Sequence, residues 1–448
     1  MNLCGEAHLG KTAVIGLGQT GFSCLNYLYG KSKLIAVDSR LHPPKKDVSK
    51  ALFPDVEYQL GAETFDSVGV DRVIVSPGIE LDSPLVATAV QKEIPVISDI
   101  DLFCETTTVP ICAITGTNGK STVTSLVGHL FQCSGYSVGV GGNLGRPALD
   151  MLDKGYELYI LELSSFQLEC MSRQRFLAST ILNISEDHLD RHESYELYAS
   201  IKQKIYLDSK FCIFNRQDMQ TKPINNQASI ISFGADLPGT GDWGIQDDWL
   251  VFADRANFER IIRIDALPLL GTHNEMNVLA GCALANAMGL DFDSIAAGIK
   301  SFEGLPHRCQ LVLERFGVKF YNDSKATNVG ATIAAISGLG NIHSKNLILI
   351  AGGDSKNANL SPLEGPISEF VKATVLMGKD AALIDQVINS DTPVLHTKTM
   401  LEAVVKATEL AEPGDFVLLS PACTSLDMFS SFEERGRKFV ESVKRVVK

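Results

Sequence analysis

A short glycine-rich turn carries the residues of this chain that are best suited to bind a phosphate group. Residues 113–124 read AITGTNGKSTVT, in which an apolar run predicts a buried strand and the residues after Gly119 predict a helix. Such a turn directs backbone N–H groups and the positive end of the helix dipole at one point. Lys120 would reach the outer phosphates of a nucleotide, and Ser121 or Thr122 would hold Mg²⁺. ATP is therefore the expected ligand.

This turn is a shortened relative of the usual phosphate loop. The longer pattern has a glycine five residues before Gly119, where this chain has Ile114. A strand-to-helix turn without a ligand is the alternative, but the run Gly-Lys-Ser-Thr at the helix start favours phosphate binding.

Two further polar side chains follow apolar strands in the same part of the chain. Residues 158–163 and 179–184 predict strands, with Glu162 near the end of the first and His188 beyond the second. Because the carboxyl ends of parallel strands meet at one edge, both are expected near Lys120. They could serve a divalent cation, although Mg²⁺ prefers oxygen donors. A capping Glu162 and a surface-loop His188 remain open as alternatives.

A lysine falls on the apolar face of a predicted helix. Residues 194–206 predict this helix, and Lys202 lies in its apolar stripe while Lys204 points away from it. One explanation is an aliphatic stem that lies along the core while the ammonium reaches water. The other is a buried amine of lowered pKa that reacts with CO₂ to form a metal-binding carbamate. The stripe consists of Tyr195, Tyr198, Ala199, Ile205 and Tyr206.

The first hundred residues resemble one half of a dinucleotide-binding fold. An apolar strand precedes Gly16, Gly18 and Gly21 in G-x-G-x-x-G spacing, and the next strand ends in Asp38. Arg40, close to this carboxylate, suits either a charged ligand or a surface turn. The glycine pattern alone is a weak signal, because a tight turn without a ligand also produces it.

Three strand exits in the last third of the chain carry hydroxyl groups and cations. They read YNDSKAT at residues 321–327, AGGDSK at 351–356 and SPACTSLDMFSSF at 420–432. We expect the first to begin a helix. Singly, such exits are N-caps and turns. Three of them in one domain favour an anion-binding face.

The alternation of short apolar strands with helices predicts an α/β protein of three domains. We place a Rossmann-like domain at residues 1–98, a central ATP-binding domain with a phosphate loop and a parallel sheet at 99–304, and a C-terminal Rossmann-like domain at 305–448. The segment from 215 to 265 is rich in turn residues and predicts a small antiparallel appendage of the central domain.

Composition excludes several classes of protein. The chain has 448 residues and a formal net charge of −13, which argues against a nucleic-acid partner. Its ten cysteines form no C-x-x-C pair, so free thiols in a reducing compartment are expected. Without a signal-like start or a run of 18 apolar residues, we expect a cytoplasmic protein. A membrane-bound partner remains open, and we expect a monomer.

Eight blocks in order resemble the Mur ligases of peptidoglycan synthesis. The resemblance spans residues 16–436 and is weakest between 215 and 265. The last three blocks are most similar to members that add D-glutamate to UDP-N-acetylmuramoyl-L-alanine. The blocks are TGTNGKST, LELSSFQLE, NISEDHLDRH, HN at 273–274, LPHR at 305–308, NDSKATN, GGDSK and LSPACTSLDMF.

This resemblance implies a mechanism and a pair of Mg²⁺ sites. ATP would phosphorylate the substrate carboxylate, and the amine of D-glutamate would attack the acyl phosphate to form an amide. Lys120 would stabilise the transferred phosphoryl group. Ser121 would contribute to one Mg²⁺, and Glu162, His188 and carbamylated Lys202 would hold the second.

The resemblance also implies three sets of binding residues and a closing movement at residues 304–306. UDP-sugar contacts would come from Gly16, Gly18, Thr20, Gly21, Asp38, Ser39, Arg40, Gly78 and Asn143. Contacts with ATP would come from Gly116, Thr117, Asn118, Gly119, Lys120, Ser121, Thr122, Asn274, Asn277, Arg308, Asp323 and Lys325. D-Glutamate would meet Thr327, Lys356, Ser425 and Phe432, with His307 beside them.

Three other functions share part of this sequence pattern. Another amide ligase of the family would use a different amino acid or a folate, against which the SPACTSLDMF block argues. A nucleotide-dependent switch would share the phosphate loop but would not need Lys202 in the helix stripe. An NAD-dependent oxidoreductase would use the glycine pattern, yet the sequence suggests no acid and base for hydride transfer.

Overall fold

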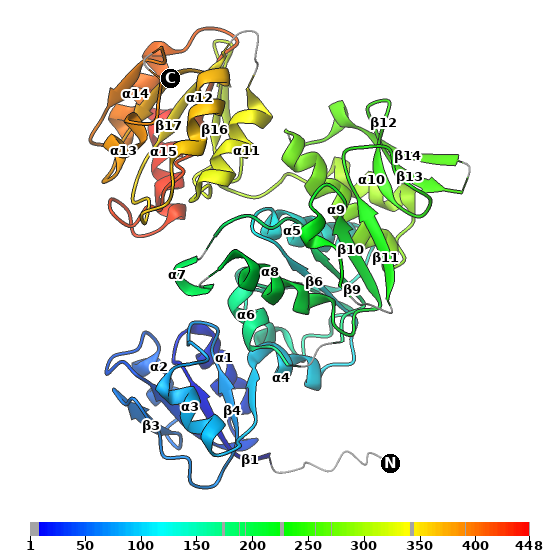
Figure 1. Cartoon of the computed structure of the whole chain (residues 1–448), viewed down its shortest axis with the longest axis vertical. Coiled ribbons are helices and arrows are strands. Elements are labelled where there is room, and N and C mark those ends of the chain that lie inside the picture. The colour runs from blue at the N-terminus through cyan, green and yellow to red at the C-terminus, as the bar shows by residue number, and fades with distance from the viewer. Residues whose placement is uncertain are drawn as a thin grey trace. The chain divides into compact units, whose positions relative to one another are not determined.

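The computed structural model describes residues 9–172, 175–187, 189–192, 194–224, 228–255, 257–269, 271–340, 345–389 and 391–447 (Figure 1). The protein is α/β, with three sheets that are parallel over most of their described pairs. It divides into two compact units. The first comprises Met1–Gly244, Phe252–Glu259 and Ala280–Ile295, and the second comprises Ile245–Val251, Arg260–Leu279 and Ala296–Lys448. The three domain boundaries stay predictions.

A five-stranded parallel sheet in the order β3-β2-β1-β4-β5 forms the start of the first unit. Alternate residues of its central strands enter two different cores: Ala13 and Ile15 one, Val14 and Ala36 the other. Both faces are covered, so these strands read as continuous apolar runs. The elements are β1 Leu9–Ile15, α1 Gln19–Leu28, β2 Ser32–Asp38, α2 Lys46–Leu52, β3 Glu57–Leu60, β4 Val70–Val75, α3 Pro84–Gln91, β5 Val96–Ser98 and α4 Asp99–Thr106.

The phosphate-loop sequence lies on a nine-stranded sheet in the order β14-β13-β12-β11-β10-β9-β6-β8-β7. β6 Ile111–Thr115 lies between β8 Leu158–Glu162 and β9 Ala178–Ile181 and is parallel to both, so their carboxyl ends share one edge. The helix α5 Lys120–Cys133 begins directly after the loop, as predicted. Other elements are β7 Val138–Gly142, α6 Ser165–Cys170, α7 Leu189–His192, α8 Tyr195–Gln203, β10 Phe211–Asn215, β13 Trp249–Asp254, β14 Asn257–Arg263, α9 Thr272–Ala287 and α10 Phe292–Lys300.

The expectation of a separate antiparallel appendage is wrong for two of its strands. β11 Ser229–Phe233 pairs in parallel with β10 along its whole length, and β12 Trp243–Gln246 bridges β11 in parallel. They therefore extend the central sheet. Turn residues such as Pro238 and Gly239 indicate where the chain reverses, but they do not reveal which neighbour a strand will pair with.

The second unit contains a six-stranded sheet in the order β15-β16-β20-β17-β18-β19. Only β15 is antiparallel to its neighbour, so β16, β20 and β17 bring their carboxyl ends to one edge side by side. The elements are β15 Gln310–Arg315, β16 Val318–Asn322, α11 Val329–Leu339, β17 Leu347–Ala351, α12 Glu364–Phe370, β18 Val371–Leu376, α13 Ala381–Asp385, β19 Val394–His396, α14 Met400–Leu410, β20 Phe416–Leu419 and α15 Phe432–Val446.

The state of the cysteines and the presence of membrane-spanning helices can be checked in the described residues. The nine cysteines among them are all free thiols, as predicted. Within the same part of the chain, no helix combines the length and hydropathy that a membrane span requires.

A buried carboxyl group joins the exits of β16 and β20. Asp323 accepts a hydrogen bond of 2.9 Å from the hydroxyl of Ser420 and one of 3.1 Å from the backbone N–H of Cys309. Ser420 also lies 3.1 Å from the hydroxyl of Thr332. Burial raises the pKa of Asp323 to about 7, although these hydrogen bonds and Arg308 act in the opposite direction.

Replacing Asp323 with Asn should flatten the dependence of stability on pH. The folded pKa exceeds the unfolded value of about 3.9, so the folded chain binds more protons between about pH 4 and 7. Asp323 therefore lowers stability as the pH rises through this window, by at most about 4 kcal/mol. Tm measured at pH 5 and pH 8 should fall less in Asp323→Asn than in the wild type.

The exposed Asp391 offers a matched control in the same sheet unit. Asp391→Asn should retain the wild-type difference in Tm between the two pH values. The same decrease in Tm for all three proteins would contradict a neutral, buried Asp323.

Candidate functional site

The first turn of the five-stranded sheet is closed tightly around its glycines. The hydroxyl of Ser76 donates a hydrogen bond of 2.8 Å to the carbonyl oxygen of Gly16. A Cβ atom at Gly21 would collide with that same oxygen. Gly18 is the N-cap of α1, so the helix start faces the exit of β1. The G-x-G-x-x-G pattern therefore produces the narrow turn that favours approach of an anion to the backbone.

Asp38 organises the neighbouring loop. Its fully buried carboxylate accepts hydrogen bonds from the backbone N–H of Leu17 at 2.7 Å and from Nε and Nη2 of Arg40 at 2.9 and 2.8 Å. Burial opposes ionisation, but the hydrogen bonds from Arg40 and Leu17 outweigh it and lower the pKa of Asp38. The pair fixes Arg40, whose side chain is half exposed at the sheet edge.

The phosphate-loop turn is held by Asn183, which lies two residues after β9. The backbone N–H of Thr117 donates to the carbonyl oxygen of Asn183 at 2.9 Å. The Asn183 side chain accepts from the N–H of Asn118 at 2.8 Å and donates to its carbonyl oxygen at 3.0 Å. Gly119 caps α5 with φ of +84°, a left-handed conformation that favours glycine. These hydrogen bonds fix the conformation of the loop.

Two lysine ammonium groups converge on this loop. Lys120 Nζ donates to the carbonyl oxygens of Gly116 and Thr117, at 2.8 Å each. Lys202 Nζ, from α8, donates to the same Gly116 oxygen at 3.0 Å and to Thr115 Oγ1 at 3.3 Å. The sequence placed both lysines on elements of one domain, and the structure brings them to one carbonyl group.

Lys202 is a buried amine, so its ammonium does not reach water; the carbamate stays a prediction. Only 1% of its surface is exposed, and its Nζ lies 4.6 Å from the centre of the Tyr198 ring. Burial and the nearby charge of Lys120 lower the pKa of Lys202, while Asp187 and Glu162 act in the opposite direction. Lys204 points elsewhere, as predicted, and donates to the carbonyl oxygen of Glu169 at 2.7 Å.

Glu162 lies at the end of β8 with one carboxylate oxygen occupied. Asn143 Nδ2 donates to Oε1 at 2.8 Å, while Oε2 is buried and has no hydrogen-bond partner among the described residues. A buried oxygen of this kind fits a hard cation such as Mg²⁺. No cluster of three His, Cys, Asp or Glu side chains forms within the described ranges. His188, the remaining predicted ligand, lies outside them.

The remaining loop residues of the predicted set lie at the start of α5. Ser121 and Thr122 are both buried there, at 6% exposure each. In the first sheet, Thr20 lies in the first turn of α1, Gly78 lies in the turn after β4, and Ser39 adjoins the Asp38 and Arg40 pair.

In the second unit, two of the predicted anion-binding exits are joined by their backbones. The N–H groups and carbonyl oxygens of Asp354 and Thr424 form an antiparallel bridge, at 3.1 and 2.9 Å. The bridge brings the segment that carries Lys356, which is exposed, beside the segment that carries Ser425, which is 3% exposed. Adjacent strands β17 and β20 therefore deliver a cation and a hydroxyl group to one face.

The exit at residues 321–327 does not begin a helix, contrary to expectation. Residues 323–327 form a loop, and α11 starts at Val329 with Asn328 as its N-cap. The reason is local: the Asn328 side chain accepts from the N–H of Ala331 and so defines the helix start. Lys325 Nζ lies 4.0 Å from the centre of the Phe432 ring, which brings a predicted ATP contact and a predicted glutamate contact together. Thr327 is half-buried in this loop.

Arg435 holds these loops, and the sequence reasoning missed it. Its guanidinium, 2% exposed, donates to the hydroxyl and carbonyl oxygens of Ser324 at 3.0 and 2.8 Å and to the carbonyl oxygen of Cys423 at 3.0 Å. Burial lowers the pKa of Arg435 to about 10, so the group is still charged at neutral pH. Its place in a strongly charged helix sequence gave no sign of burial.

The other predicted residues of this unit have local partners. Asn274 and Asn277 are buried on α9 and are joined by a side-chain hydrogen bond of 3.2 Å. Asn322 Nδ2 lies 2.9 Å from Nδ1 of His307, and the backbone N–H of Lys325 donates to the His307 carbonyl oxygen at 3.1 Å. Arg308 follows directly and exerts its charge on Asp323.

Models of three Mur ligase domains match this chain in order. They are the Mur ligase MurD-like, N-terminal domain over residues 10–98, the Mur ligase middle domain over 114–285, and the Mur ligase, glutamate ligase domain over 307–423.

Relatives match along almost the whole length. A UDP-N-acetylmuramoylalanine--D-glutamate ligase from Pseudomonas aeruginosa is 44% identical over 440 residues, 97% of either chain. One from Legionella pneumophila is 45% identical over 439 residues, 96% of this chain and 98% of that one.

Two solved structures share the fold at 18% sequence identity. A pseudomurein peptide ligase type C from Methanothermus fervidus has a TM-score of 0.63 over 97% of this chain and 99% of its own. A UDP-N-acetylmuramate-alanine ligase from Thermotoga maritima has a TM-score of 0.58 over the same shares. From the three domain models and the relatives of 44 and 45% identity, this chain belongs to the Mur ligase family.

Proposed function

We propose that this chain uses ATP to join D-glutamate to UDP-N-acetylmuramoyl-L-alanine, a step of peptidoglycan precursor synthesis. The observation that carries the proposal is the convergence of Lys120 and Lys202 on the Gly116 carbonyl group of a phosphate loop. The relatives of 44 and 45% identity, which bear the name of this ligase, indicate the amino acid. We further propose that the protein acts in the cytoplasm as a monomer.

The reaction has two steps. An oxygen of the substrate carboxylate attacks the γ-phosphorus of ATP, the bond to the β–γ bridging oxygen breaks, and ADP leaves. The amine nitrogen of D-glutamate then attacks the acyl carbon, the carbon–oxygen bond to phosphate breaks, and the amine loses a proton. Both steps develop negative charge on the transferred phosphoryl group, so a fixed cation lowers the barrier.

Lys120 is proposed as that cation. Its ammonium lies over the loop, and the contacts with the Gly116 and Thr117 carbonyl oxygens hold it at the start of α5. A nucleotide phosphate at the helix start would offer it a stronger, charged acceptor than either carbonyl group. The backbone N–H groups from Gly116 to Ser121 would bind the remaining phosphate oxygens.

Lys202 is proposed to act as a carbamate. Its lowered pKa favours the neutral amine, whose nitrogen attacks CO₂, forms a carbon–nitrogen bond and releases a proton. The product is an anion with two oxygen donors in place of the amine. With Glu162 Oε2, which is buried and unpartnered among the described residues, it would offer oxygen ligands for Mg²⁺. His188 is proposed as a further ligand of this Mg²⁺, and Ser121 as a ligand of the other Mg²⁺. Bound Mg²⁺ would neutralise phosphate charge.

The substrates are proposed to bind at three strand edges. The turn around Gly16 and Gly21, together with Asp38 and Arg40, would hold the uridine diphosphate part, with Asn143 near the reacting carboxylate. D-Glutamate carries two carboxylates, and Lys356 supplies a cation while Thr327 and Ser425 supply hydroxyl donors. Asn274, Asn277, Arg308, Asp323 and Lys325 are proposed as further ATP contacts. A closing movement of the C-terminal domain, with its hinge at residues 304–306, is also part of this proposal.

The first test is amino-acid specificity. With Mg²⁺, ATP and UDP-N-acetylmuramoyl-L-alanine, phosphate release should occur with D-glutamate and yield an amide product. L-glutamate, L-alanine, L-lysine and meso-diaminopimelate should give no release. Release with another amino acid instead would retain the ligase mechanism and reject the glutamate assignment, and no release with any of them would reject the ligase activity.

Lys202→Ala should lower kcat by about 10²-fold or more, since it removes a group at the phosphoryl site. If the carbamate is its role, added short carboxylic acids should restore part of the activity by filling the space with an oxygen anion. Lys204→Ala is the matched control, because that amine contacts Glu169 and not the loop. Normal turnover by Lys202→Ala would remove the carbamate from the mechanism.

Lys120→Ala should abolish phosphoryl transfer, with a loss of at least about 10²-fold, and leave UDP-sugar binding unchanged. The reason is that Lys120 contacts the phosphate loop, whereas the proposed uridine contacts lie on the five-stranded sheet. Titration calorimetry with UDP-N-acetylmuramoyl-L-alanine measures the second property, and Lys154→Ala is a surface control. Simultaneous loss of sugar binding would show that the substrates are divided wrongly between the sheets.

A further inference from the structure

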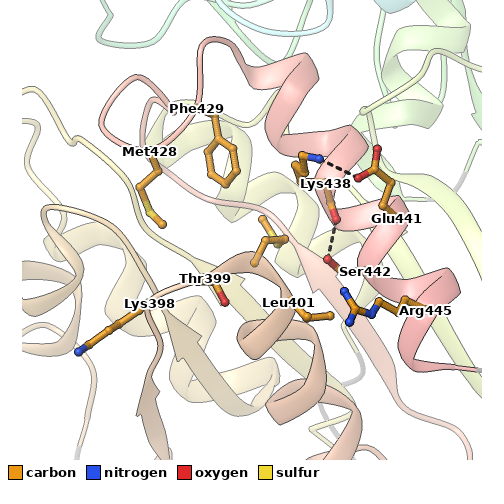
Figure 2. Close-up of a pocket in the computed structure, with 10 residues that line it drawn as sticks. Lys398, Thr399, Leu401, Met428, Phe429, Lys438, Glu441, Ser442 and Arg445 are labelled. Carbon is orange, nitrogen blue, oxygen red and sulfur yellow. Dashed lines mark hydrogen bonds and ion pairs between the residues drawn. The ribbon is translucent and has the colours of Figure 1, made fainter.

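A cavity in the second unit takes no part in the mechanism above. Its volume is about 460 Å³, within the range of small-molecule sites. Figure 2 shows it between the first turn of α14, the second half of α15 and the segment that precedes α15. Nothing in the proposed reaction requires a hollow at this place.

One side of the cavity is apolar. Met400, the first residue of α14, is 5% exposed, and Phe429 packs against the core cluster that contains Phe439 and Val443. Met428 is 37% exposed, and in Figure 2 its side chain and the Phe429 ring extend from their loop toward α14. An aromatic or branched apolar group would bury these surfaces.

The opposite side is positively charged, in a chain whose net charge is −13. Lys398, Lys438 and Arg445 line it with one carboxylate, that of Glu441. Lys438 is paired with Glu441 at 2.9 Å, and Lys398 points away from the hollow in Figure 2. Arg445 has no ion pair among the described residues and lies beside Ser442 and Leu401. Its planar guanidinium is suited to a carboxylate or phosphate.

The start of α14 adds to this preference for an anion. Thr399 is its N-cap and accepts the N–H of Glu402 at 3.2 Å. The positive end of the helix dipole therefore faces the cavity that Thr399 and Met400 line. An arginine with no ion pair in the described part of the chain, a helix start and an apolar wall define one amphiphilic site.

The cavity wall is continuous with the loop proposed to hold D-glutamate. The backbone N–H groups of Met428 and Phe429 donate to the carbonyl oxygen of Ser425 at 3.1 and 2.8 Å. Movement of Met428 or Phe429 against a bound molecule would therefore be transmitted to Ser425 through one hydrogen-bonded turn.

We propose that this cavity binds a small amphiphilic anion, an aromatic or branched apolar group that carries a carboxylate or phosphate, and that its occupancy alters the affinity for D-glutamate. The apolar part lies against Met400, Met428 and Phe429, and the anionic part pairs with Arg445. The effect on affinity rests on the proposed function of Ser425, whereas binding of the anion does not.

The test uses 2-naphthoate as the probe and ligand-observed NMR on the full-length protein. Arg445→Gln should weaken binding fivefold or more, because it removes the charge from an exposed side chain. Leu401→Trp should abolish binding by filling the cavity from α14. Lys444→Gln is the matched control, since Lys444 is the exposed neighbour on α15 that does not line the cavity, and it should bind as the wild type does.

Two further measurements separate this site from the substrate site. Saturating D-glutamate should leave the probe bound, and the probe should change KM for D-glutamate at least twofold in the wild type but not in Arg445→Gln. Equal binding by all variants, equal binding of neutral 2-naphthamide, or displacement by D-glutamate would overturn the site. An unchanged KM with the probe bound would overturn the coupling to the Ser425 turn.

Discussion

The Gly116 carbonyl group, which accepts hydrogen bonds from both Lys120 and Lys202, is the contact on which the proposed catalytic centre depends. A buried amine must find acceptors, since an unpaired polar group away from water costs free energy. Here the acceptors belong to the phosphate loop. The hydrogen bonds from Lys202 therefore help to order the loop, and the same hydrogen bonds allow the amine of Lys202 to be buried. Burial and the nearby charge of Lys120 lower the pKa of Lys202, which increases the fraction of neutral amine.

All three sheets position their polar residues by the same geometric constraint. In a parallel sheet, adjacent strands end at one edge, and the loops that follow them become neighbours even when they are far apart in sequence. Asn183 after β9 thus reaches the loop after β6, and Thr424 after β20 pairs with Asp354 after β17. The loops supply the polar side chains, and the order of the strands determines which loops become neighbours.

Buried polar groups hold several of these loops through hydrogen bonds to neutral partners. Arg435 donates to three neutral oxygens from two strand exits, and Asp323 accepts from a hydroxyl group and a backbone N–H. Such groups contribute less to stability than apolar residues of their size. What they contribute is position: each fixes the relative placement of two segments that the proposed function requires to be close.

The sequence by itself determined the fold class, the phosphate loop and the inward face of Lys202, because local periodicity and turn chemistry encode these features. It could not determine the pairing of β11 and β12, since strand direction depends on partners elsewhere in the chain. It also could not show that Arg435 is buried, because a charged residue in a polar helix sequence is normally exposed. The convergence of Lys120 with Lys202, and the cavity beside Arg445, were decided by tertiary packing, which alone sets distances between residues remote in sequence.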